Sequence, residues 1–357
     1  MQLEFNSTYF IIFSLISFFS TYLITKNSNF FFSGSLVDKD FLKPQAFHKE
    51  AIARIGGLII FSLFTLFILC YFFVFDIFLK DYFTISLLLF ILGFLDDLKI
   101  KINPNIRLVL MFVILVYCIN IFSIQIAHSG LEFLNSWLKN NIFQVCFVLL
   151  CFLFVINGAN LIDGFNGLLA IHFLIINSVF LIINLSNQNE NISIILFAQI
   201  IIVLSFLLFN FPKSKIFLGD SGSYLLGALI VLNTIKTYEL NSSTYNSTIS
   251  PFFFAGVLFY LFYEVFFSFI RKILLKKSPL RPDKNHLHML VYKWLSSTKK
   301  IKNSNYLTSL LINSCYLLLQ IPFFYFQDDG LVLRYWFLAL IALYTIIYFR
   351  LYSFSKK

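Results

Sequence analysis

Long apolar runs separated by short polar segments extend along nearly the whole chain. Eleven of these runs are long enough, or nearly so, for a helix to cross the hydrocarbon core of a bilayer, which takes about 20 residues. They cover residues 8–25, 57–76, 82–95, 107–125, 142–157, 167–185, 192–210, 222–236, 251–271, 307–325 and 332–350. The third and eighth runs are short, so we expect their helices to extend into flanking polar residues or to cross a thinned bilayer. The pattern predicts an all-α integral membrane protein, a polytopic bundle of about eleven transmembrane helices.

Composition agrees with this fold class and gives no sign of a separate soluble domain. The hydrophobic fraction is 59%, the charged fraction is 12% and the mean hydropathy is +0.84. A soluble protein needs more charge to cover its surface. No internal repeat is evident, so we expect residues 1–357 to form a single polytopic membrane domain.

The basic residues predict how the bundle is oriented. If the eleven spans alternate in direction, 23 of the 27 Lys and Arg residues fall in the loops on one side and 4 on the other. By the positive-inside rule the richer side faces the cytoplasm, which puts the N-terminus in the periplasm and the C-terminus in the cytoplasm. Most of the net charge of +10 then faces anionic lipid headgroups. Nucleic-acid binding is not expected, because these residues lie between lipid spans and no recognition motif accompanies them.

Three polar segments on the predicted cytoplasmic side carry most of the candidate chemistry: residues 95–98, 157–167 and 210–222. They contain four acids, namely Asp96, Asp97, Asp163 and Asp220. A charged side chain at the centre of a membrane helix costs roughly 2.5–3.5 kcal/mol. Four acids at the ends of spans on one aqueous face therefore indicate a site that holds a cation and a phosphorylated ligand.

Asp96 and Asp97 end the third run. A helix C-terminus already carries partial negative charge, so two acids there call for a compensating cation, either a basic side chain or a metal ion. Adjacent carboxylates repel each other, and one of them could have a raised pKa and act as a base. An ordinary polar helix end is the alternative interpretation.

The segment 157–167 carries Asn157, Asn160, Asp163 and Asn166 at steps of three residues. Such spacing places polar groups on one face if the segment is helical. The glycines between them permit tight turns and close approach of a ligand to the backbone. A polar turn between two spans is the alternative, but a turn alone does not need amides and an acid in register.

The segment 210–222 contains Asn210, Phe217 and the string Gly219-Asp220-Ser221-Gly222. Asp220 or Ser221 is suited to cap the N-terminus of the next helix. Capping does not exclude ligand binding, because a helix N-terminus also favours phosphate oxygens.

Two further cytoplasmic loops hold candidate residues. Loop 272–306 contains His286 and His288, whose i, i+2 spacing excludes a zinc site of the H-E-x-x-H type. We expect them to contact a phosphate or diphosphate, with surface histidines as the alternative. In loop 26–56, Lys49 is a candidate nucleotide contact, although a basic loop beside anionic lipid explains it equally simply. The pair Gly56-Gly57 at the end of this loop is expected to serve close helix packing.

Together these strings resemble the polyprenyl-phosphate N-acetylhexosamine-1-phosphate transferases, the WecA/MraY superfamily of family 4 glycosyltransferases. The resemblance runs from about residue 43 to 290, with five motifs in the family's order. Asp96 and Asp97 match the family's Asp-Asp motif. Asn157, Asn160 and Asp163 match its N-x-x-N-x-x-D-G-x-D-G motif.

The later motifs match as well. Asn210, Phe217 and Asp220 match N-x-P-x5-F-x-G-D-S/T-G, and His286 and His288 match the late histidine motif.

The chain departs from the family pattern at two positions. Asn166 stands where many members have a second aspartate, and Met289 stands where many have another histidine. The His-x-His form and the eleven predicted spans resemble the WecA-like branch more than the MraY branch.

The resemblance implies transfer of N-acetylhexosamine-1-phosphate from a UDP-N-acetylhexosamine to undecaprenyl phosphate at the cytoplasmic face of the bacterial inner membrane. This reaction releases UMP and initiates synthesis of a lipid-linked glycan. The cytoplasmic loops 26–56, 96–107, 157–167, 210–222 and 272–306 would form the active site. The implied cofactor is Mg²⁺, with Mn²⁺ as an alternative, because hard carboxylate oxygens suit such ions. A homodimer is a further expectation from the family.

The resemblance also implies roles for individual residues. Asp220 and Asp97 would hold the metal. Asp96, Asp97 and Asp163 would serve catalysis, with Asp96 deprotonating or orienting the acceptor phosphate. Asn210 and Phe217 would contact uridine, and the histidines the diphosphate. The full set of expected substrate-binding residues is Asn157, Asn160, Asn166, Asn210, Phe217, His286, His288 and Lys49.

Three other functions stay open on the sequence. An MraY-type phospho-N-acetylmuramoyl-pentapeptide transferase would use the same chemistry on a different donor. A non-catalytic transporter or scaffold predicts lost acids, and only Asn166 fits that pattern. A membrane phosphatase would replace the lipid phosphate with water, but no phosphatase signature is evident.

Overall fold

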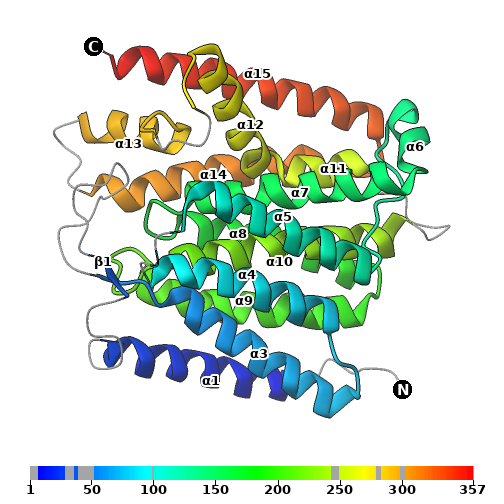
Figure 1. Ribbon diagram of the computed structural model, residues 1–357, viewed down its shortest axis with the longest axis vertical. Coiled ribbons are helices and arrows are strands. Elements are labelled where there is room, and N and C mark those ends of the chain that lie inside the picture. Colours follow the sequence, from blue (N-terminus) through cyan, green and yellow to red (C-terminus); the bar gives the residue numbers. More distant parts are fainter. Residues whose placement is uncertain are drawn as a thin grey trace.

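The computed structural model describes residues 7–28, 36–38, 52–98, 100, 102–242, 249–278, 283–297 and 303–356. These residues form fourteen helices and two short strands. Most of the helices run roughly parallel or antiparallel in one bundle (Figure 1). β1, α13 and the C-terminal end of α15 lie at one end of the bundle, and α6 lies at the other. The all-α architecture predicted from the apolar runs is confirmed.

Each of the eleven predicted runs corresponds to a helix or, once, to a helix pair. The first half of the chain forms α1 (Ser7–Lys26), α3 (Gly56–Phe75), α4 (Lys80–Asp97), α5 (Pro104–Ile121), α6 (Glu132–Leu138), α7 (Asn141–Ile162) and α8 (Leu168–Ser186). The second half forms α9 (Glu190–Asn210), α10 (Gly219–Ser242), α11 (Pro251–Val257), α12 (Phe259–Leu274), α13 (Leu287–Ser297), α14 (Ser304–Tyr325) and α15 (Gly330–Phe354). The short helices α6 and α13 lie outside the predicted runs.

Among the described residues, eight helices are long and apolar enough to cross a membrane. They are α1, α3, α5, α7, α8, α9, α14 and α15. The pair α11 and α12, bent by 70° at their junction, is a ninth candidate span. The chain is therefore a multi-pass membrane protein, and the count of eleven spans with its sidedness stays a prediction.

The two runs that looked too short form α4 and α10, with 18 and 24 residues. Both helices extend into flanking polar residues, as expected. α10 packs against α4, α7, α8 and α3, and most of its length is buried. It is less apolar than its neighbours because it carries polar side chains that bond inside the bundle.

Asn233 of α10 is the centre of one such buried group. It donates to Gln199 Oε1 at 2.6 Å and to Asn177 Oδ1 at 3.1 Å, and it accepts from the Tyr82 hydroxyl at 2.9 Å. These bonds join α10 to α9, α8 and α4. A central helix that is satisfied by protein partners needs less hydrophobicity than one that faces lipid, which explains why hydropathy alone underestimated its length.

A small sheet ties the loop before α10 to the start of α3. β1 (Val37–Asp38) pairs antiparallel with β2 (Ile52–Ala53), and Ala53 also forms a parallel bridge to Ile216. The Phe217 amide donates to the Ala53 carbonyl at 2.8 Å, and the Gly56 amide donates to the Phe217 carbonyl at 2.9 Å. The apolar pattern did not predict these strands.

Gly57 sits where α3 meets the N-terminus of α10. A Cβ on Gly57 would lie 2.3 Å from the Gly222 nitrogen and 2.3 Å from Ser221 Oγ. Only glycine lets the two backbones approach this closely. The expectation that this pair serves close packing is confirmed for Gly57.

Candidate active site

The start of α10 is held by a carboxylate from the end of α4. Asp97 Oδ1 accepts from the Asp220 amide at 3.0 Å, and Asp97 Oδ2 accepts from the Ser221 amide at 2.9 Å and from Ser221 Oγ at 2.6 Å. The Asp97 side chain has no solvent exposure. Asp97 is thus an N-terminal cap for α10 that is supplied by another helix, and the positive end of the α10 dipole compensates its charge.

Gly219 makes this approach possible. Its φ is +79°, a left-handed conformation that favours glycine. A Cβ at this position would lie 2.6 Å from Asp97 Oδ2. The backbone turn that begins α10 therefore depends on glycine both for its conformation and for its contact with Asp97.

Asp96 and Asp220 face each other across one guanidinium. Arg107, near the start of α5, contacts Asp96 Oδ2 and lies 3.4 Å from Asp220 Oδ2. Asn160 Nδ2 donates to the other oxygen, Asp220 Oδ1, at 2.9 Å. The side chains of Asp96, Arg107 and Asp220 are 17%, 25% and 29% exposed, so a ligand can reach them from solvent. Two acids that are distant in sequence thus meet in one open site.

Asp163 follows the last residue of α7 and is only partly exposed. Its burial and then the negative charge of Asp220 raise the pKa of the Asp163 carboxyl well above its usual range, and Arg54 offsets part of this. Arg54 itself lies 3.9 Å from Asp97 Oδ1. The Asp163 carboxyl therefore holds its proton more tightly than a free carboxyl does.

The asparagines of the 157–167 segment separate into two groups. Asn160 bonds Asp220 and also donates to Ser223 Oγ at 2.9 Å, so it belongs to the acid cluster. Asn157 instead donates to the Leu153 carbonyl in its own helix at 2.7 Å. The side chain of Asn157 is thus engaged within α7 rather than with the acids, and its substrate role stays a prediction.

Asn166 and Asn210 brace two loops against each other. Asn210 Oδ1 accepts from the Gly167 amide at 2.7 Å, and its Nδ2 donates to the Ile216 carbonyl at 2.9 Å. Asn166 Nδ2 donates to the Pro212 carbonyl at 2.9 Å. These bonds give both side chains a scaffolding role that the sequence did not suggest. Their predicted contacts with substrate are not part of this geometry and stay predictions.

The two histidines differ in their surroundings. His286 Nδ1 lies 3.1 Å from Glu264 Oε1, and His286 Nε2 lies 3.4 Å from Asp283 Oδ1. His288 is fully buried, and neither of its ring nitrogens has a hydrogen-bond partner among the described residues. The His288 ring contacts Phe165 with ring centroids 5.7 Å apart, which connects the histidine segment to the loop that carries Asp163.

Other predicted residues are less constrained. Phe217 is partly exposed at the edge of the α10 turn, and its backbone is fixed by the small sheet. Lys49 lies outside the described residues.

The sequence did not assign a role to Glu264. Its only signal in the sequence was that of a single acid inside an otherwise apolar run.

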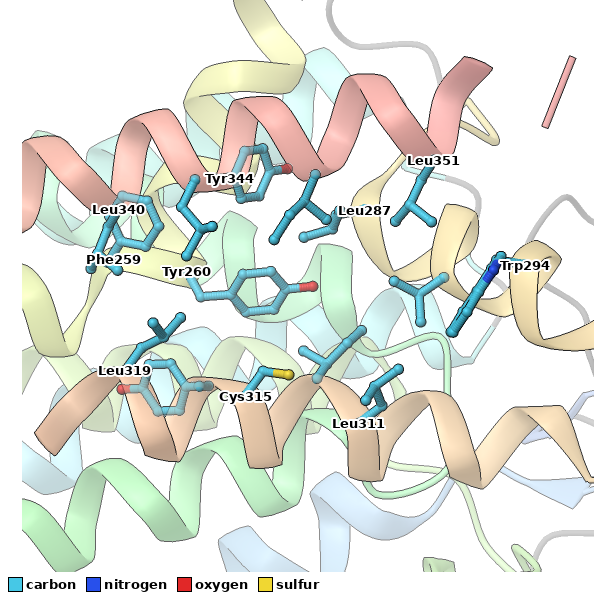
Figure 2. A pocket seen from close by; sticks show the side chains of 15 residues that line it. Phe259, Tyr260, Leu287, Trp294, Leu311, Cys315, Leu319, Leu340, Tyr344 and Leu351 are labelled. Atoms are coloured by element: carbon cyan, nitrogen blue, oxygen red, sulfur yellow. The ribbon is translucent and has the colours of Figure 1, made fainter. Parts of the chain in front are cut away.

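An apolar cavity of about 280 Å³ lies between α12, α13, α14 and α15 (Figure 2). Tyr260, Trp294, Leu311 and Tyr344 are among its lining residues, and none of the four clustered acids is. Leu287, which lies between the two histidines in sequence, also lines it. The cavity therefore borders the histidine segment and is not lined by the acid cluster.

The acid cluster suits a hard divalent cation that keeps part of its water shell. Among the described residues, no group of three or more His, Cys, Asp or Glu side chains is arranged to hold a metal ion. Mg²⁺ is usually bound through one or two carboxylates together with substrate phosphates and water, so a complete protein cage is not required. Asp220 and Asp96 fit this pattern, whereas both oxygens of Asp97 are already occupied by donors from α10.

Comparison with known proteins identifies the family. The profile of glycosyl transferase family 4 matches residues 81–238. The undecaprenyl-phosphate alpha-N-acetylglucosaminyl 1-phosphate transferase of Thermotoga maritima is 32% identical over 250 residues, which cover 68% of this chain and 68% of that protein. The chain belongs to glycosyl transferase family 4. The expected membership is thereby confirmed, and the matched residues contain all four clustered acids.

Two further relatives represent both branches of this family. A probable undecaprenyl-phosphate N-acetylglucosaminyl 1-phosphate transferase of Bacillus subtilis is 28% identical over 57% of this chain and 55% of its own length. A phospho-N-acetylmuramoyl-pentapeptide-transferase of Dictyoglomus turgidum is 31% identical over 64% of this chain and 74% of its own length. The family 4 profile ends before the histidine segment, so the geometry around His286 and His288 comes from this structure alone.

Proposed function

We propose that this family 4 protein transfers N-acetylhexosamine-1-phosphate from a UDP-sugar to undecaprenyl phosphate and releases UMP. The observation that carries the proposal is the partly exposed cluster of Asp96, Asp220 and Arg107, with Asp163 beside it, where several membrane helices end. A site at the end of the bundle is accessible both from the aqueous phase, where the nucleotide sugar is dissolved, and from the bilayer, where the acceptor lies. The names of the Thermotoga and Bacillus relatives support this substrate pair.

The proposed reaction is a displacement at phosphorus. An oxygen of the acceptor phosphate attacks the phosphorus that bears the sugar, and the bond from that phosphorus to the bridging oxygen of the diphosphate breaks. UMP leaves with the bridging oxygen, and a lipid-linked diphosphate sugar forms. Positioning and charge stabilisation supply most of the catalysis in such transfers. Arg107 would stabilise negative charge on the reacting phosphates, and Asp96 would orient the acceptor phosphate or accept its proton.

In this proposal Asp220 and Asp96 would hold Mg²⁺, or Mn²⁺ in its place. The ion, when bound, neutralises charge on the donor diphosphate. Arg107 would then move from the two acids towards the phosphates. Asn160 keeps Asp220 oriented, and Asp97 keeps the whole α10 turn in place rather than binding the metal directly. Phe217 would stack on uridine.

A muramyl-pentapeptide donor is the second candidate, because MraY-type transferases also match this chain. The Thermotoga match covers slightly more of the chain and favours the simpler UDP-sugar. The cytoplasmic orientation, the inner-membrane location and a homodimer complete the proposal, with orientation resting on the distribution of Lys and Arg.

The test is a transfer assay with purified protein, undecaprenyl phosphate, Mg²⁺ and, separately, each UDP-N-acetylhexosamine and the UDP-muramyl-pentapeptide. We expect a lipid-linked product from one UDP-N-acetylhexosamine, and loss of product in Asp220→Asn. Asp81→Asn is the matched control, because Asp81 is an acid at the opposite end of α4 that pairs with Lys236 at 3.2 Å. Product from the pentapeptide donor alone would select the second candidate. A folded protein without product from any donor would refute the proposal.

A further inference from the structure

A buried carboxylate outside the acid cluster holds the segment that carries the histidines. Glu264 of α12 is 1% exposed. Its Oε1 accepts from the Leu287 amide at 3.2 Å and lies 3.1 Å from His286 Nδ1, and its Oε2 accepts from the Tyr344 hydroxyl at 2.6 Å. Both carboxylate oxygens are therefore used, and two of the three contacts go to the histidine segment.

This arrangement has an energetic cost that packing alone would not require. An uncompensated charge inside an apolar helix is strongly unfavourable, whereas a carboxylate with several donors is tolerated. An apolar residue at position 264 would avoid that cost. The hydrogen bonds of Glu264 lead to the histidine segment and to its neighbour Tyr344. The buried charge is therefore best explained by its role in holding the histidine segment in place.

A second set of contacts joins the same elements about two helical turns further along α12. Arg271 donates to the Asn285 carbonyl at 2.6 Å, pairs with Asp283 at 2.8 Å and donates to the Tyr348 hydroxyl at 2.6 Å. The Tyr348 hydroxyl also donates to the Asn285 carbonyl at 3.0 Å. The segment before α13 is thus fixed between α12 and α15 by one acid, one base and two tyrosines.

The two histidines differ in their contacts with these residues. His286 has a carboxylate oxygen near each ring nitrogen, Glu264 Oε1 near Nδ1 and Asp283 Oδ1 near Nε2. The His288 ring is parallel to it, with an interplanar angle of 2° and centroids 5.6 Å apart. Burial, more than the neighbouring positive charge, lowers the pKa of His288 to about 3. His288 therefore stays neutral beside Phe165, with both ring nitrogens unpartnered within the described part of the chain.

We propose that Glu264 is a positioning residue of the transferase site, which fixes His286 and thereby sets His288 against the loop that carries Asp163. The division of roles follows from the contacts: His286 lies between the carboxylates of Glu264 and Asp283, and His288 is the histidine whose ring nitrogens have no partner among the described residues. Tyr344 of α15 supports Glu264 from the apolar cavity, where Tyr344 and Leu287 both line the wall (Figure 2). This inference rests on the proposed function and extends it to the C-terminal helix.

The experiment uses the full chain in lipid nanodiscs and compares Glu264→Gln with the wild type. Gln keeps the size of the side chain but removes the charge and one of the acceptor oxygens. We expect kcat for transfer to fall about 10-fold or more, since small misplacements of site groups have effects of this size. We expect KM for the nucleotide sugar to stay within about 3-fold, because the donor-binding acids are untouched. Tyr344→Phe removes one of the three contacts and should lower kcat by less.

Hydrogen–deuterium exchange supplies a readout that does not need activity. In Glu264→Gln the amides of residues 287–290 should exchange about 10-fold faster or more, while those of α10 stay unchanged. Glu239→Gln is the matched control, because Glu239 lies near the other end of α10 beside Lys236, 4.0 Å away, and this variant should match the wild type in both assays.

Two results would overturn the inference: wild-type kcat in Glu264→Gln, or faster exchange spread over α10 and α12 as in general destabilisation. If Glu264→Gln does not fold, the pair Tyr344→Phe and Tyr348→Phe decides, since it leaves the charge in place. Unchanged kcat and unchanged exchange at 287–290 in that double variant would equally refute the role. A wild-type protein without transfer activity would refute the proposed function, while the exchange experiment would still test the contacts of Glu264.

Discussion

Replacing Asp97 with Asn separates a structural role from a catalytic one within the same acid cluster. In the structure Asp97 accepts three hydrogen bonds from the first residues of α10, and its side chain is fully buried. An amide keeps one acceptor oxygen but turns an NH₂ group towards backbone donors. The start of α10, and with it Asp220, would then lose its anchor.

The expected cost follows from these contacts. Hydrogen bonds to a charged partner contribute about 1.5–3 kcal/mol each, and they are not additive when they share one carboxylate. Asn retains part of this set, so we expect Asp97→Asn to destabilise the protein by about 2–4 kcal/mol. The melting temperature of the purified protein should fall by roughly 4 °C or more, and transfer activity should fall with it.

Asp220→Asn is the comparison variant, because it tests for loss of activity without loss of stability. The Asp220 side chain is 29% exposed, and its ion pair with Arg107 is long at 3.4 Å, so its contribution to stability is small. This variant should lose activity while its melting temperature stays within about 2 °C of the wild type. Thermal melts and transfer rates measured on the same preparations distinguish the two cases. If Asp97→Asn melts like the wild type and is inactive, Asp97 acts on the metal or the substrate, and the capping argument fails.

Three further variants probe other parts of the site. Gly57→Ala places a Cβ 2.3 Å from the backbone of Gly222, and it should lower the yield of folded protein in size-exclusion chromatography. Asn210→Ala leaves the buried Gly167 amide without its partner, and a loss of about 1–3 kcal/mol should appear in thermal melts. For Asp163→Asn the sign of the change in stability follows from the raised pKa of Asp163. When the folded state raises the pKa of a carboxyl, the protein loses stability as the pH rises from about 4, the usual carboxyl pKa, through the pKa in the folded state. This variant should therefore be inactive yet melt higher than the wild type at pH 8, with the gain absent at pH 4, and an equal gain at both values would contradict the assignment.

The fold was largely predictable because lipid imposes simple rules on sequence. Helices are the natural solution for apolar runs of this length, and all eleven runs became helical. The rules failed where a helix is surrounded by protein, as for α10 with Asn233 at its centre. They also failed for the bend of 70° between α11 and α12, which the apolar run did not reveal although Gly256 lies beside the junction.

The acid cluster was predictable as a set but not in its internal roles. Motif order indicated that Asp96, Asp163 and Asp220 would meet, and the structure brings them together with Asn160. Asn210 could not be assigned from sequence, because its partners are backbone groups of distant loops. Glu264 was missed since its partners come from α13 and α15, more than twenty residues away.

The acid pair at the end of α4 shows how the N-terminus of one helix can compensate negative charge at the C-terminus of another. Two carboxylates at a helix C-terminus require compensation, and the sequence left a basic side chain and a metal ion as alternatives. In the structure the two carboxylates have different partners, since the N-terminus of α10 compensates Asp97 and Arg107 compensates Asp96. Protein groups therefore supply the compensation for both carboxylates of the pair. If Asp96 and Asp220 hold a metal ion as proposed, Arg107 is the group that would be released from them towards the phosphates.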